Sequence, residues 1–170
     1  STHWLVFPII QAFTFAAGMS VLMTGVRMFL AEITAAFVII SEKFIPGSRP
    51  ALDVPTVFPY APNAVIIGFI SAYAAGLIAV FVMAALPSIF PVVIIPAAHI
   101  CFFSGGTAAV FGNSSGGWRG AVLGSFVVGL LLAFLPTILY PLYGSLGVEG
   151  ATFPNVDYNV VGTILHKILQ

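Results

Sequence analysis

Charged residues are scarce in this chain, and their scarcity decides its class. The 170 residues include five Lys and Arg and five Asp and Glu, so 6% are charged, while 60% are hydrophobic and the mean hydropathy is +1.13. Soluble domains carry about 25% charged residues. Because this composition cannot cover a surface in water, the sequence predicts an integral membrane protein. The net charge of zero provides no basic field for phosphates, so we expect no nucleic-acid partner.

Cysteine is nearly absent as well. The one cysteine, Cys101, excludes an internal disulfide, and no metal-ligand spacing accompanies it, so we expect neither a metal site nor a cofactor. Cys101 is interpreted as a small buried hydrophobe. The first residues lack the basic region of a signal peptide, and the chain reads as a piece of a longer protein.

Long apolar runs dominate what is present. The runs at 4–30 (or on to 40), 64–86 and 120–140 are long enough to cross a bilayer, and the last is closed by Pro136 and Pro141. The shorter run 89–103 contains Pro91 and Pro96, so it either spans as a kinked helix or is re-entrant. A final apolar segment covers 160–169. We predict an all-α integral membrane protein, a single membrane domain over 1–170, with about three to five transmembrane or re-entrant helices.

Two segments interrupt these helices. Segment 41–63 contains Pro46, Pro50, Pro55, Pro59 and Pro62, and segment 104–117 is rich in glycine. Broken backbone at membrane depth is tolerated only where it is buried in protein or lines a wet cavity. Paired broken segments of this kind point to a transporter's substrate site. We therefore take 41–63 as a substrate-site segment and 104–117 as a second broken segment.

Asp53 is the main candidate in the first of these segments. It is followed by no other charged residue until Arg119. An Asx-turn or capping role in an ordinary loop is one interpretation. The other is an intramembrane acid that binds a polar substrate or handles a proton. Tyr60 and Asn63 could add hydrogen bonds to the same cavity, although Asn63 also fits the N-cap of the following helix.

The glycines of the second segment favour helix packing over chemistry. No Lys follows them, so the phosphate-loop pattern fails. Gly112, Gly116, Gly120 and Gly124 recur every four residues, which predicts one helical face open to close backbone contact. The alternative to packing is that this segment contacts a ligand through Asn113 or through backbone N–H groups. His99, with no carboxylate at helical spacing, is interpreted as a packing residue.

Several ordered motifs carry a family resemblance. At "PALDVP", "FPYAPNAVIIGFI", "GGTAAVFGN" and "GGWRGA" the chain resembles the ascorbate-specific permease component, IIC, of the bacterial phosphoenolpyruvate-dependent phosphotransferase system (PTS), over its C-terminal part. Val54 departs from the family, whose members usually carry Cys after this Asp. The resemblance implies a homodimeric, all-helical, multi-pass permease of the bacterial inner membrane.

The resemblance also implies a substrate and a partner. L-ascorbate is expected to cross the bilayer and to be phosphorylated on the cytoplasmic side by a phosphocysteine of the IIB component. No phosphoryl-accepting residue is expected in this chain. The Asp of the PALD motif, Asp53 here, belongs to the family's site, and most other ligand contacts belong to the N-terminal part.

Asp53 could orient, or even deprotonate, the hydroxyl that receives the phosphoryl group. Two other functions remain open on the residues alone. The chain could belong to an ion-coupled secondary transporter of a small polar solute, with Asp53 as the coupling acid. It could also be a structural membrane subunit in which the glycine face mediates helix contacts.

Overall fold

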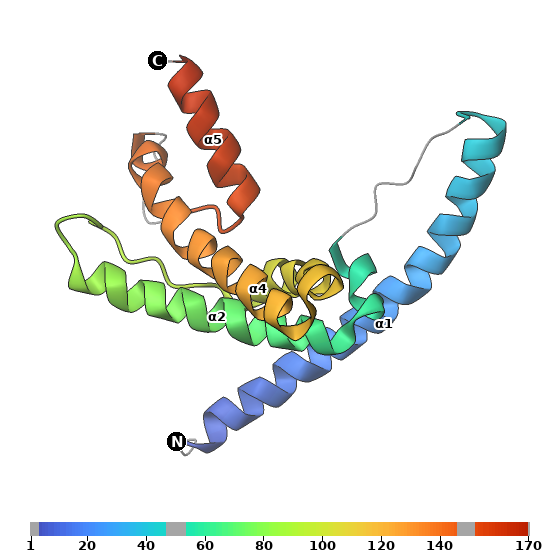
Figure 1. Cartoon of the computed structure of the whole chain (residues 1–170), viewed down its shortest axis with the longest axis horizontal. Helices are drawn as coiled ribbons and strands as arrows, with labels where there is room; N and C mark the ends of the chain where they lie inside the picture. The colour runs from blue at the N-terminus through green and yellow to red at the C-terminus, as the bar shows by residue number, and fades with distance from the viewer. Residues whose placement is uncertain (1–3, 47–53, 146–151, 170) are drawn as a thin grey trace. The chain divides into compact units, whose positions relative to one another are not determined.

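The computed structural model describes residues 4–46, 54–145 and 152–169, and within them it contains helices and no strand (Figure 1). The elements are α1 (Val6–Lys43), η1 (Val54–Tyr60), α2 (Pro62–Ala85), α3 (Ala98–Ile100), η2 (Cys101–Gly105), α4 (Gly106–Ser145) and α5 (Val156–Leu169). Three stretches are long and apolar enough to cross a membrane: Val6–Lys43, Pro62–Ala85 and Ala98–Pro141. The predicted all-α membrane fold is confirmed.

The chain divides into two compact units, residues 1–56 and 57–170. The first unit is built on α1, which continues as one helix of 38 residues through Arg27 and Glu32. Most of its side chains are exposed, including those of Phe13, Val21 and Met28. The sequence predicted that this apolar run ends at residue 30 or at residue 40, whereas the helix continues to Lys43.

In the second unit, α4 consists of two helical arms that meet at Gly117. The backbone of Gly117 has φ 58° and ψ −151°, which only glycine adopts easily, whereas the residues on both sides are helical. The arms 106–116 and 118–145 return along each other. Ser125 Oγ donates to the Gly105 carbonyl at 2.7 Å, and Ala109 packs against Ala121.

The reversal at Gly117 corrects two expectations about the glycines. Gly112 and Gly120 do not share one helical face: they belong to opposite arms, and a Cβ on either would overlap the carbonyl of the other. Segment 104–117 is helical from 106 to 116, with a π-helical turn, η2, before it. The break therefore falls at Gly117, because the tight return of the chain needs a positive φ at one residue.

Helix α2 packs against both arms through small residues. A Cβ on Gly68 would overlap Ala109 and the Gly105 carbonyl, and one on Gly129 would overlap the backbone of Ala72. Ser71 Oγ donates to the Val122 carbonyl at 2.8 Å. Small side chains let the helix backbones approach closely, which is how apolar helices gain contact where lipid is as apolar as they are.

The region around 89–103 is not a helix of its own. The chain forms turns and bends after α2, is irregular up to Ala97, whose backbone is extended, and is helical only from Ala98. Pro91 and Pro96 explain this, since proline removes a helical N–H and disfavours the helical conformation of the residue before it. By contrast, Pro136 and Pro141 do not close the last span, because α4 continues to Ser145.

Candidate functional site

Asp53 lies outside the described residues, and the predicted substrate-site segment is described again from Val54. Segment 41–63 is helical up to Lys43, and its last part forms the 3₁₀ helix η1, with Pro59 inside it. Prolines lack the N–H that a longer helix would need, so this part of the chain forms a short 3₁₀ helix. Pro62 then occupies the first turn of α2.

Phe58 anchors η1 in the second unit. Its side chain is 1% exposed. Its ring lies edge-on to Phe102, with centroids 5.5 Å apart, and is stacked with Phe103 at 6.2 Å. Phe102 continues the cluster to Phe69 at 5.7 Å. Aromatic pairs in this geometry add to the apolar area that they bury. Sequence reasoning missed Phe58, although an aromatic residue between Pro55 and Pro59 in "PTVFPY" was the available signal.

Tyr60 and Asn63 are both exposed, and neither is enclosed by described residues. Tyr60 ends η1 with 85% of its side chain exposed. Asn63 is the second residue of α2, and Ala61 holds the N-cap position without a side-chain hydrogen bond. Asn63 is therefore not the N-cap. Pro62 starts the helix instead, because its fixed φ suits the first helical position. The role of Tyr60 and Asn63 in substrate binding stays a prediction.

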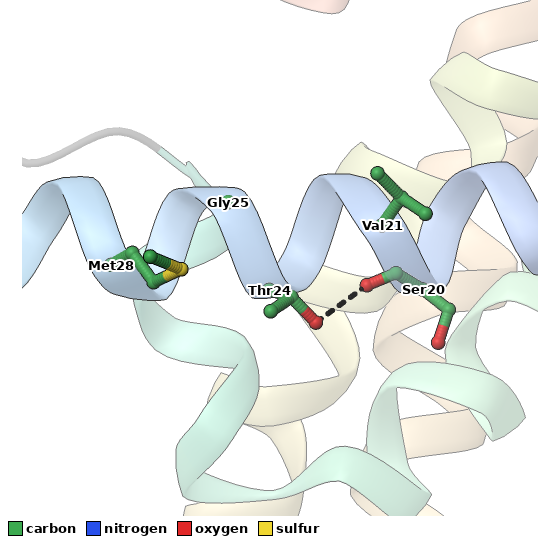
Figure 2. Close-up of a pocket in the computed structure, with 5 residues that line it drawn as sticks. All are labelled: Ser20, Val21, Thr24, Gly25 and Met28. Atoms are coloured by element: carbon green, nitrogen blue, oxygen red, sulfur yellow. Dashed lines mark hydrogen bonds between the residues drawn. The ribbon is translucent and has the colours of Figure 1, made fainter.

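A hollow of about 400 Å³ lies on the first unit (Figure 2). It is lined by residues of α1 alone among those described: Ser20, Val21, Thr24, Gly25 and Met28. Thr24 Oγ1 already donates to the Ser20 carbonyl at 2.9 Å. The hollow offers small and apolar side chains and no charged group, so it has the character of a packing surface on the helix.

Asn159 is the buried polar side chain that sequence reasoning missed. It is 1% exposed, and its Nδ2 donates to the carbonyls of Phe153 at 2.9 Å and Asn155 at 2.6 Å. Its Oδ1 has no hydrogen-bond partner among the described residues. The two donated bonds hold the segment before α5 against the helix. We assign Asn159 a structural role, since an amide that donates to two carbonyls fixes a loop.

Other predicted residues fall outside any common site. His99 and Arg119 are exposed, and Arg119 lies 5.6 Å from the ring of Trp118. Cys101 is a free, fully buried thiol, as the sequence predicted. Within the described residues, no three His, Cys, Asp or Glu side chains gather closely enough to hold a metal ion.

Comparison with known proteins identifies the family. The model of the PTS system sugar-specific permease component, EIIC-GAT, matches residues 1–157. The "Ascorbate-specific PTS system EIIC component" of Mycoplasma pneumoniae is 38% identical over 124 residues, which are 71% of this chain and 19% of that protein. The chain spans about a fifth of that relative's length. It belongs to the EIIC-GAT family of membrane permease components.

Proposed function

We propose that this chain is part of a permease that takes up L-ascorbate and passes it to a phosphorylated IIB component. The observation that carries the proposal is the 38% identity with a relative named as ascorbate-specific. Its three apolar helical stretches fit a protein that crosses the bilayer several times. We place it in the bacterial inner membrane, and a homodimer belongs to the same proposal.

The chemistry of ascorbate defines what the site must provide. The molecule is an anion at neutral pH and carries several hydroxyl groups. A carboxylate at Asp53 would repel the ring and accept hydrogen bonds from the side-chain hydroxyls, so we place Asp53 at the hydroxyl end. There it would orient the hydroxyl that receives the phosphoryl group, since phosphoryl transfer depends mainly on positioning and charge stabilisation.

The anchored helix η1 supports this role for Asp53. η1 begins at Val54, directly after Asp53, and its Phe58 is buried in the aromatic cluster. Pro50 and Pro55 flank Asp53 in the sequence, and the fixed φ of proline favours a stiff segment. Fixed placement is what a substrate-binding carboxylate requires.

An Asp53→Asn variant of the permease that carries this chain tests the proposal. We expect ascorbate binding, measured by calorimetry in detergent, to weaken at least tenfold with an unchanged melting temperature, because one charge-assisted hydrogen bond is worth about 1.5–3 kcal/mol. Asp157→Asn, which changes an exposed carboxylate in α5, is the matched control and should bind normally.

Three other outcomes each have a meaning. Normal binding without phosphorylation by IIB would assign Asp53 the role of base. Normal binding with normal phosphorylation would remove Asp53 from the site. Uptake that needs no IIB and stops with a protonophore would replace the proposed function with ion-coupled transport.

A further inference from the structure

The non-helical segment 91–97 returns along α2 into the second unit (Figure 1). Phe90 and Ile94 pack against the cluster of Ala79, Met83 and Ala133 near the end of α2. Pro96 lies against Gly76, where an added Cβ would be 2.8 Å from the proline Cβ. Gly76 is nine residues from the end of α2, or about 14 Å along the helix axis at 1.5 Å per residue. In a spanning α2, segment 91–97 therefore reaches membrane depth.

The backbone of this segment has no hydrogen bonds to the described residues. Among them, no hydrogen bond joins the main chain of 91–96 to any other group, and the first such bond is donated by Cys101 to the Ala97 carbonyl. Pro91 and Pro96 have no N–H, but the four residues between them present N–H and C=O groups. Lipid cannot satisfy these groups, so the segment must face water, a polar molecule or another polypeptide.

Two serine side chains of this unit's spans are already engaged. Ser71 donates to the Val122 carbonyl and Ser125 to the Gly105 carbonyl. No charged residue occurs between Asp53 and Arg119. Among the described residues, the main chain of 91–96 is thus an open polar surface beside this part of α2.

We propose that segment 91–96 lines the substrate path of the permease, and that its backbone hydrogen-bonds the hydroxyl oxygens of a polyhydroxylated solute. This inference rests on the proposed function. In an extended chain the N–H groups of Val93 and Ile95 point to one edge, and those of Val92 and Ile94 point to the other. One edge contacts the solute, while Ile94 and Pro96 hold the segment on α2.

The bulky apolar side chains of segment 91–96 are compatible with a substrate path. Small-molecule sites are mostly apolar, with a few fixed polar groups that provide orientation. Val93 and Ile95 are 42% and 77% exposed, so the segment has one face free of the second unit. A backbone donor held between two prolines is fixed in place before the solute arrives, which lowers the entropy lost on binding.

Hydrogen exchange at single amides tests this inference. The permease that carries this chain is measured in nanodiscs with and without ascorbate, and ascorbate binding is measured by calorimetry on the same sample. We expect the amides of one edge to exchange rapidly without ascorbate and at least tenfold more slowly when it is saturating. The amides of Ile78 and Phe81 in α2 serve as controls that stay slow throughout.

Each alternative result overturns the inference. Slow exchange in both states would assign the edge to a permanent polypeptide partner. Rapid exchange in both states, with ascorbate bound, would exclude the segment from the site and leave the proposed function intact. Absence of ascorbate binding would remove the proposed function together with this inference.

A proline scan supplies a second readout. Because no hydrogen bond to a described residue uses these N–H groups, proline at a protected position should raise KM for uptake at least tenfold without changing the melting temperature. Proline at its neighbour on the other edge is the matched control. An equal KM for both variants and the unmodified permease would contradict the role of the backbone.

Discussion

Helices α1 and α2 are both apolar enough to span a membrane, yet they differ in packing within their own units. None of the most apolar stretch of α1 is buried, whereas 39% of that of α2 is buried. Hydropathy is therefore a guide to which segments enter the bilayer, but it does not say which of them pack against protein.

The glycines explain this difference. Apart from their own helix backbone and chain neighbours, Gly18 and Gly25 of α1 have no described heavy atom within 4 Å of where a Cβ would lie. In the second unit a Cβ on Gly68, Gly105 or Gly129 would overlap a neighbouring helix. Glycine thus permits close helix contacts in the second unit, whereas in the first unit the glycines of α1 make no such contact. What distinguishes them is the partner, not the local sequence.

The largest expected difference in stability is between leucine substitutions at a packed glycine and at an open one. Gly129→Leu should lower the stability of the permease by about 3 kcal/mol, or roughly 10 °C in melting temperature, because the side chain has to displace the backbone of Ala72. Gly25→Leu should leave the melting temperature nearly unchanged. Thermal unfolding in detergent measures both. A similar loss at Gly25 would break the comparison, since it would show that α1 also has a close neighbour.

A smaller effect is expected at the turn between the two arms of α4. Gly117→Ala should cost about 1–3 kcal/mol, because a Cβ is strained at φ 58° although nothing lies within 4 Å of it. Gly116→Ala is the matched control, since its site is equally open and its φ is not positive. Equal melting temperatures for the two variants would contradict the assignment of the reversal to Gly117.

The sequence alone predicted the fold class and the clearest membrane span, α2. The apolar run 64–86 predicted α2 to within two residues, because its length and hydropathy depend only on local composition. The turn at Gly117 could not be located, since two adjacent glycines permit it equally. Only the contacts between the arms, such as that of Gly112 with Gly120, decide which residue reverses the chain.

The candidate site was harder to predict than the fold. The prolines predict an interrupted region, but the burial of Phe58 depends on rings that lie more than forty residues further along the chain. The lack of a helix up to Ala97 follows from Pro91 and Pro96, whereas the return of this segment along α2 depends on the space left by Gly76. The contribution of Asp53 remains a prediction.

The smallest expected change in stability concerns a feature that α1 and α2 share: neither helix has an N-cap side chain that hydrogen-bonds its first turn. Leu5 and Ala61 hold the two N-cap positions. Asn63→Ala should therefore change stability by less than about 0.5 kcal/mol, where a true N-cap would lose about 1 kcal/mol. Ser125→Ala, which removes the hydrogen bond to Gly105, serves as the positive control with a loss of about 1 kcal/mol. A loss at Asn63 equal to that at Ser125 would restore the capping role. Unchanged stability with weaker ascorbate binding would instead place Asn63 in the substrate site, because binding contacts on an exposed helix start contribute nothing to the fold.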